Sequence, residues 1–126
     1  MKSDVEVFLH YAAAFETAYA TDQWQAVREC FAEDATYEVE GAPPFAGKWT
    51  GRDAVVDHLI ESVNGFDRTY DERVLEIMEG PEIRDGAVYI RWGGVYKKKG
   101  QDDLRAEGTE YAWIEDGKVQ RLKDVM

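Results

Sequence analysis

The feature that most constrains the fold is a change in hydrophobic spacing part-way along the chain. In residues 4–20, apolar side chains recur every three or four positions, which is the spacing of a helix with one buried face. Later in the chain the spacing has a period of two, in segments near 67–79, 86–98, 103–115 and 118–125. Turn sequences separate these segments, and Asp116-Gly117 is a strong signal for a two-residue hairpin. Helices followed by strands predict an α+β domain that contains an antiparallel meander.

The middle of the chain mixes the two kinds of element. "TDQWQAVRECF" predicts a second helix that starts with a capping box at Asp22, and residues 34–40 predict a strand. Residues 41–49, "GAPPFAGKW", predict a loop because they are rich in Gly and Pro. A third helix is expected from a capping box at Thr50 to a left-handed end at Gly65. We therefore expect three N-terminal helices on one face of a curved, mixed or antiparallel sheet.

Composition limits the classes of partner. The length predicts one domain, residues 1–126. A net charge of −11 repels phosphate backbones and anionic bilayers, so neither nucleic acid nor a membrane is an expected partner. Cys30 is the only cysteine, and His10 and His58 lack the spacing of metal ligands, so the sequence predicts no metal site and implies no cofactor. With no signal-peptide pattern, a cytoplasmic protein is expected.

Several stretches together point to a known family. "DQWQAVRECFAEDATYEVEG", a Gly/Pro loop, "GRDAVVDHL" and a strand meander that closes with "DGKVQRL" follow one another in the chain. This order resembles the nuclear transport factor 2-like superfamily, and most closely its SnoaL-like branch, the relatives of ketosteroid isomerase and the polyketide cyclases. The resemblance implies a cone-shaped α+β barrel (cystatin-like) with a pocket between sheet and helices. It also implies dimers formed through the outer sheet face. It leaves the activity open, because the superfamily includes isomerases, cyclases, epoxide hydrolases, dehydratases and binding modules.

Alternation along the first predicted strand assigns its side chains to two faces. Tyr37 and Val39 share the apolar face, which predicts that Glu38 and Glu40 point to solvent. A one-residue register shift would reverse this and bring Glu40 inward. In the resemblance to ketosteroid isomerase, Val39 takes the place of the general base and Phe15 that of the oxyanion-hole tyrosine. Steroid isomerisation by that mechanism is therefore not expected.

Two acids on later strands are the candidates for chemistry. Glu110 is the single carboxylate on the small, apolar face of residues 104–114, and it aligns to within a residue with the acid that the isomerase keeps protonated. Burial in such a face raises a carboxyl pKa. The alternatives are a salt bridge to Arg91 or Arg121, or simple exposure. Asp124 shares its strand face with the residues that line the pocket in this family, and it would pair with Glu110; the alternative is a solvated chain end.

Aromatic residues complete the candidate site. Tyr11 lies one helical turn before Phe15, so its phenol can reach the pocket. We expect Tyr37, Trp92 and Tyr96 to line the interior, with Phe45 as a lid and His58 at the edge. Such a set favours an apolar or aromatic small molecule, although the same rings could fill a core. Tyr111 and Trp113 fall on the opposite strand face, which predicts a covered surface and hence a homodimer.

Three functional hypotheses follow. The first is an acid–base enzyme, an isomerase, cyclase or dehydratase, with Glu110, Asp124 and Tyr11 as its catalytic residues. The second is a binding protein with the same pocket and no catalysis. The third is a dimerisation module whose interior is filled.

Overall fold

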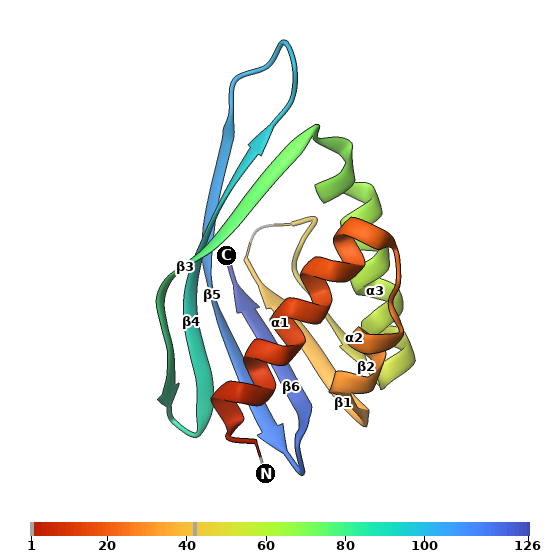
Figure 1. The fold of residues 1–126 in the computed structure, drawn as a ribbon, viewed down its shortest axis with the longest axis vertical. Coiled ribbons are helices and arrows are strands. Elements are labelled where there is room, and N and C mark those ends of the chain that lie inside the picture. Colours follow the sequence, from red (N-terminus) through yellow and green to blue (C-terminus); the bar gives the residue numbers. More distant parts are fainter. Residues whose placement is uncertain (1, 42) are drawn as a thin grey trace.

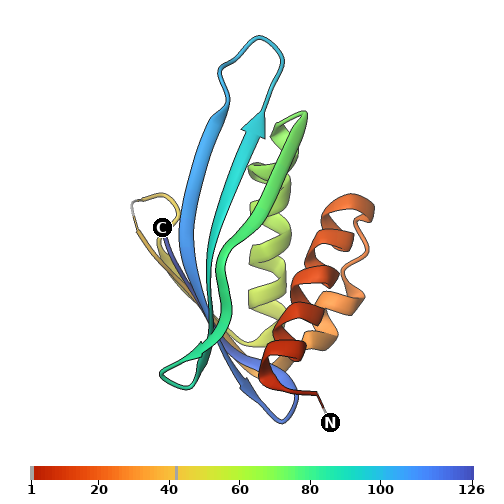
Figure 2. The same ribbon diagram turned by 60° about the vertical axis from the view of Figure 1, so that its left-hand side comes forward.

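The computed structural model describes residues 2–41 and 43–126, so Met1 and Ala42, at the start of the predicted domain and within the predicted 41–49 loop, lie outside the described residues. It has an α+β fold in which helices cover one face of a six-stranded sheet (Figure 1; Figure 2). The elements, in chain order, are α1 (Asp4–Thr21), α2 (Gln25–Cys30), β1 (Phe31–Glu40), β2 (Gly47–Thr50), α3 (Arg52–Gly65), η1 (Asp67–Thr69), β3 (Glu72–Arg84), β4 (Ala87–Lys97), β5 (Leu104–Glu115) and β6 (Lys118–Val125).

The sheet is mixed, with strand order β2-β1-β6-β5-β4-β3. Strands β3 to β6 form the predicted antiparallel meander, and β6 returns to pair in parallel with β1. This pairing places the last strand of the chain between β1 and β5, in the middle of the sheet. The C-terminus is held there, since the Met126 backbone N–H donates to the Glu40 carbonyl oxygen at 2.9 Å.

Ser3 or Asp4 is the expected cap of the first helix, and Ser3 caps the start of α1 through a capping box with Glu6. The start of the second helix differs from the predicted one. Asp22 does not open a capping box on the second helix. It ends α1 in the left-handed conformation, and its carboxylate accepts hydrogen bonds from Trp24 and Arg68. The helix dipole and free carbonyls at a helix end favour such nearby cations, and the Arg68 guanidinium also donates to two of the last carbonyls of α1.

The position and ends of the third helix, and the loop before it, also differ from the prediction. Only α1 and α2 precede the sheet, because α3 follows two strands. Thr50 belongs to β2, so Gly51 stands at the N-terminal cap of α3 and no side chain caps it. The helix ends at Gly65 and is followed by Phe66 at φ −130°, without a left-handed residue. The predicted 41–49 loop is wrong for its last three residues, which form part of β2 against β1.

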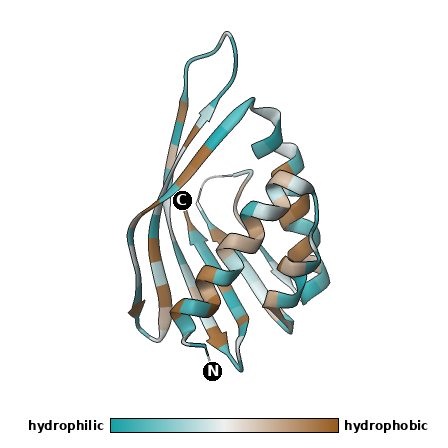
Figure 3. Ribbon diagram, in the orientation of Figure 1, coloured by the Kyte–Doolittle hydropathy of each residue, from teal (hydrophilic) through white to brown (hydrophobic). Residues whose placement is uncertain are grey.

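The core lies between the helices and the face of the sheet that they cover (Figure 1). Figure 3 shows hydrophobic residues on both the helices and the strands. The fully buried large side chains of the core come from α1, α2, α3 and the central strands, and include Phe8, Val27, Phe31, Val55, Val56, Val88, Val119 and Leu122. Burying each such side chain contributes on the order of 2 kcal/mol relative to exposure. This packing fixes the central strands against α1, which determines where their inward polar side chains lie.

Candidate active site

Two acidic side chains meet on the inward face of the sheet. Glu110 on β5 lies directly opposite Asp124 on β6, and Asp124 lies beside Val39 of β1. We call Glu110 and Asp124 the acid pair. The inward face is the one that also carries Tyr37 and Leu122, because Leu122 pairs with Ala112 and lies two residues from Asp124. The alternative of a solvated chain end for Asp124 is therefore wrong.

The hydrogen bonds of Asp124 show how the pair is held. The Tyr37 hydroxyl donates to Asp124 Oδ2 at 2.5 Å. The other carboxylate oxygen, Oδ1, is buried and accepts no hydrogen bond within residues 2–41 and 43–126. The Glu110 carboxyl lies close enough to the Asp124 carboxyl for a hydrogen bond to affect the pKa of both acids. Two carboxyl groups can share a hydrogen bond only when one is protonated. A hydrogen bond between Glu110 and Asp124 therefore forms only when one of the two acids carries a proton.

The pKa values indicate which acid carries that proton. Burial, and then the charge of Asp124, raise the pKa of Glu110 well above the ordinary range. Burial also raises the pKa of Asp124, but hydrogen bonds from Tyr37 and Glu110 stabilise its anion, so the pKa of Asp124 reaches only about 6. Near neutral pH, Glu110 is thus the protonated partner and Asp124 is the carboxylate.

Two phenols flank the acid pair. Tyr11, on α1, is 5% exposed, and burial together with the charges of Glu110 and Asp124 raises the pKa of its hydroxyl well above the usual value. The same causes, again led by burial, raise the pKa of Tyr37. Both phenols therefore stay protonated near neutral pH. Tyr37 already donates to Asp124, whereas the Tyr11 hydroxyl makes no hydrogen bond within the described part of the chain.

The rings of Trp49 and His58 pack beside Tyr37. The Tyr37 ring lies 5.7 Å from Trp49, and Trp49 stacks on His58 at 3.4 Å between centroids. Burial lowers the pKa of His58, so its imidazole is neutral at physiological pH, with Nε2 3.3 Å from the Ser62 hydroxyl. His58 thus lies in the wall beside Tyr37. Trp49 was missed as a site residue because its short strand was taken for loop.

The other aromatic residues separate into two places. Phe15 lies next to Tyr11 and Trp24, at centroid distances of 6.3 and 5.9 Å. Trp92, which is half-buried, lies across Gly108, two residues from Glu110 on the same strand face.

Phe45 and Tyr96 do not join these residues. Phe45 is 49% exposed and packs on Phe66, which in turn contacts Tyr96. Their aromatic contacts run through Phe66 to Tyr70, away from the acid pair. Burial raises the pKa of Tyr96 to about 12, so it is a neutral phenol within that second cluster.

The outward face of the same strands carries the basic residues. Arg91 bonds Glu79 at 2.7 Å and lies 3.7 Å from Glu107. Glu38 faces outward as predicted and lies near Arg121 and Lys123. The alternative of a salt bridge from Glu110 to Arg91 or Arg121 is therefore wrong.

The outward face also carries stacked rings. Tyr111 and Trp113 stack at 6.1 Å, and the Arg121 guanidinium lies 4.5 Å above the Trp113 ring. Both rings are half-buried within the chain itself.

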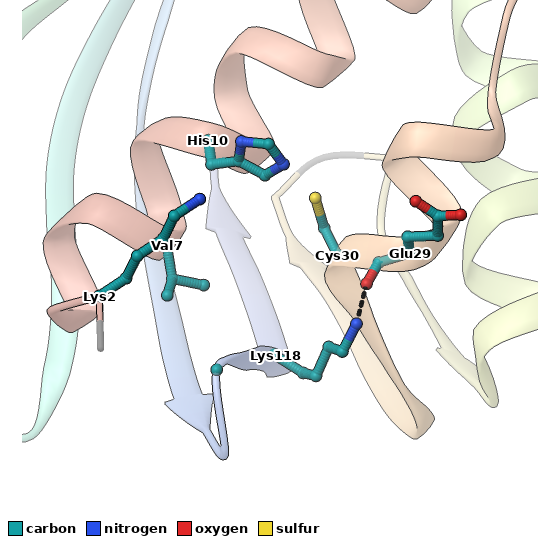
Figure 4. Close-up of a pocket in the computed structure, with 7 residues that line it drawn as sticks. Lys2, Val7, His10, Glu29, Cys30 and Lys118 are labelled. Carbon is teal, nitrogen blue, oxygen red and sulfur yellow. Dashed lines mark hydrogen bonds between the residues drawn. The ribbon is translucent and has the colours of Figure 1, made fainter.

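Two hollows of about 240 Å³ lie outside the acid pair. The first is between the start of α1, the end of α2 and the β5–β6 turn, where Lys118 donates to the Glu29 carbonyl (Figure 4). Cys30 borders it, and its thiol already bonds the Ala26 carbonyl at 3.2 Å. The second lies on the outer sheet face over β3, β4 and β5. In the described residues no cluster of three His, Cys, Asp or Glu is arranged for a metal ion.

Comparison of the chain with known protein families identifies its family. The model of the SnoaL-like domain matches residues 11–122, which covers most of the chain. The chain belongs to the SnoaL-like branch of the nuclear transport factor 2-like superfamily. The matched range includes Tyr11, Tyr37 and Glu110 and ends just before Asp124.

Solved structures share the fold at low sequence identity. An NTF2-like protein of unknown function from Exiguobacterium sp. 255-15 has a TM-score of 0.71 at 16% identity, over 94% of this chain and 96% of that one. TerC, co-crystallised with polyporic acid, has a TM-score of 0.72 at 13% identity, over 98% and 90%.

A third structure is a protein with a ketosteroid isomerase-like fold from Catenulispora acidiphila DSM 44928, in complex with trimethylamine. It has a TM-score of 0.65 at 16% identity, over 90% of this chain and 82% of that one. No curated protein matches the sequence. None of the described helices is both long and apolar enough to cross a bilayer.

Proposed function

We propose that this SnoaL-like protein is an acid–base enzyme that moves a proton within a small organic molecule bound between helices and sheet. The observation that carries the proposal is the acid pair with one phenol hydrogen-bonded to it and a second phenol free beside it. Two titratable groups whose environments push their pKa values apart are the usual basis of such chemistry.

Each group has a role in this proposal. Asp124, with a pKa of about 6, is a carboxylate at neutral pH and accepts a proton from an acidic C–H of the substrate. Glu110 and Tyr37 hold that carboxylate by hydrogen bonds, so they act as positioning residues. The Tyr11 hydroxyl donates to the substrate oxygen, where the electron pair of the broken C–H bond accumulates. Return of the proton to another atom completes an isomerisation, and loss of hydroxide after deprotonation completes a dehydration.

The substrate class follows from the side chains around the acid pair. Tyr11, Tyr37, Phe15 and Trp92 present aromatic surface around a small number of polar atoms, which favours an apolar or aromatic ligand. Glu110 and Asp124 occupy strands different from the one that carries the isomerase base, so the reaction is assigned by class and not by that enzyme's mechanism.

Hydrogen exchange tests the proposal without knowledge of the substrate. A panel of aryl ketones is incubated with the protein in D₂O, and loss of the C–H signal beside the carbonyl is followed by ¹H NMR. We expect exchange with at least one ketone, lowered on the order of 10²-fold in Asp124→Asn because general-base catalysis is removed. Glu38→Gln, on the outward face, is the matched control and should exchange at the wild-type rate. Equal rates for wild type and Asp124→Asn would contradict the proposal.

A second candidate is a non-catalytic binding or dimerisation module. The stacked Tyr111 and Trp113 on the outward face favour a homodimer through that face. Light scattering after gel filtration tests it: wild type should have twice the mass of the chain, and Trp113→Glu should be monomeric because a charge would enter the interface.

A further inference from the structure

The acid pair has no positive partner within the described chain. Every charge that acts on Tyr11, from Glu110, Asp124, Cys30 and Glu16, raises its pKa, and the charges that act on Tyr37 do the same. The basic residues of the same strands point to the other face, where Arg91 pairs with Glu79 and Lys123 pairs with Glu40. Folding therefore brings two carboxyl groups and two phenols together, and leaves the Asp124 charge uncompensated.

Two hydrogen-bonding atoms of the site, the Tyr11 hydroxyl and Asp124 Oδ1, have no hydrogen-bond partner in the described part of the chain. The Tyr11 residue is 95% buried, the charges of both acids raise the pKa of its hydroxyl, and that hydroxyl bonds no group within residues 2–41 and 43–126. Asp124 Oδ1 is itself a buried oxygen that accepts no hydrogen bond from these residues. Buried polar atoms without partners are rare in folded proteins, and those in a functional site commonly contact a ligand.

Aromatic faces adjoin these oxygens. The Trp92 indole lies across Gly108, so close that a Cβ there would be 3.0 Å from the ring, and Gly108 is two residues from Glu110 on the same face. Phe15 packs on Tyr11 from the helix side. An organic ammonium ion is bound by two kinds of group: carboxylate oxygens and the faces of Trp and Tyr rings. Both kinds lie side by side here.

We infer that the acid pair and its flanking rings bind a small organic cation, an arylalkyl ammonium, whose charge replaces the shared proton. The inference rests on the proposed site and names the chemical class of its ligand. An anionic ligand is disfavoured because it would place a third negative group beside Asp124. The net charge of −11 also attracts cations to the protein over distances of about 8 Å at physiological salt.

Binding of a cation should be linked to a proton. The titratable groups beside the pair are Tyr37 of β1, which donates to Asp124, and Tyr11 of α1, whose pKa both acids raise, with His58 of α3 beside Tyr37. Glu16 and Cys30 act on Tyr11, and Glu16 is paired with Arg73; β4 contributes Ile90 and Trp92, which do not titrate. Within the pair, Glu110 is the group that a nearby positive charge would deprotonate. Cation binding should therefore release up to one proton near pH 7, and affinity should rise with pH.

The test uses two probes of similar shape and different charge, 2-phenylethylammonium and 2-phenylethanol. Calorimetry at 0.15 M salt, in phosphate and in Tris at pH 7.5, gives the affinity and the number of protons released. We expect the ammonium to bind at least tenfold more tightly than the alcohol, to release a proton, and to bind at least tenfold more weakly at pH 5 than at pH 8. The alcohol should release none.

Three variants connect the result to the acid pair. Asp124→Asn should weaken the ammonium at least tenfold, because it removes the carboxylate. Glu110→Gln should weaken the ammonium and abolish proton release, because it removes the carboxyl group that the cation would ionise; a merely structural role would not abolish the proton release. Glu38→Gln, on the outward face, should match wild type and reports any general attraction to acidic surface.

The outcomes separate this inference from the proposed function. Equal affinity of the two probes, or an Asp124→Asn variant that binds the ammonium like wild type, would overturn the cationic ligand while leaving ketone exchange in D₂O intact. Loss of all exchange with ammonium binding unchanged would overturn catalysis and keep the ligand class. Circular dichroism of each variant establishes that it is folded.

Discussion

Acidic side chains have opposite environments on the two faces of strands β1, β5 and β6. On the outward face, Glu38 of β1 and Glu107 of β5 lie beside arginine or lysine and are in contact with water. On the inward face, Glu110 and Asp124 lie beside each other, and one of them keeps its proton. A displacement of one position along a strand decides between the two environments. The number of acidic residues therefore indicates little about function. The face of the sheet on which each acidic side chain lies indicates much more.

The largest expected contrast is in the pH dependence of stability. Asp124 has an unfolded pKa near 3.8 and a folded pKa of about 6, so the folded state binds its proton more tightly. Its stabilising contribution is complete below pH 3.8 and is lost as pH rises through 6, by about 3 kcal/mol at 1.4 kcal/mol per pKa unit. Asp124→Asn should therefore gain stability relative to wild type between pH 4 and pH 7 in urea unfolding. Glu38→Gln should show no such gain, and a parallel gain there would contradict the contrast.

The next contrast compares two tyrosines. Tyr37→Phe removes the hydroxyl that donates to Asp124 Oδ2, leaving a buried carboxylate oxygen unpaired, which should cost about 1–3 kcal/mol at pH 7. It should also raise the pKa of Asp124 above 6. Tyr111→Phe, on the outward face, removes no hydrogen bond of the described residues and should change stability by less than about 0.5 kcal/mol. Chemical denaturation of both variants measures the difference, and equal losses would show that the Tyr37 bond contributes nothing.

Two glycines offer the smallest contrast. A Cβ at Gly108, on the inward face, would lie 2.7 Å from the Val125 carbonyl oxygen and 3.0 Å from the Trp92 ring, so Gly108→Ala should cost about 1–3 kcal/mol. A Cβ at Gly93, on the outward face, meets only the flexible end of Met78, and Gly93→Ala should cost less than about 1 kcal/mol. Thermal unfolding compares them. A larger loss for Gly93→Ala would mean that the outward face is the more tightly packed one.

Much of this contrast was accessible from the sequence. Alternation along 35–40 placed Tyr37 inward, and alternation along 104–114 put Glu110 on the apolar face of its strand, although exposure and a salt bridge stayed open for it. The hairpin at Asp116-Gly117 also formed, with both residues at positive φ. These features depend on local spacing, and local spacing is what a single sequence contains.

Other features depend on contacts between distant segments. Asp124 was predicted on the pocket-lining face by family resemblance, but an exposed chain end stayed an alternative, because its burial comes from parallel pairing with β1, more than eighty residues away. Trp49 and β2 were hidden in a stretch rich in Gly and Pro whose strand character comes from β1. Phe45 and Tyr96 were assigned to the pocket by their apolar character. In the structure both rings pack on Phe66, in a separate aromatic cluster. No local pattern records which of two apolar clusters a ring will join.

The most direct test of the central claim is a ¹³C NMR titration of side-chain carboxyl carbons from pH 3 to pH 9. The account predicts that the Glu110 carboxyl keeps the chemical shift of a protonated acid through neutral pH, while the Asp124 carboxyl titrates with a midpoint near 6. Glu38, on the outward face, serves as the internal reference for an acid in contact with water and basic side chains. If Glu110 and Asp124 both titrate together with the exposed acids near pH 4, they share no proton, and the proposed acid–base site is wrong.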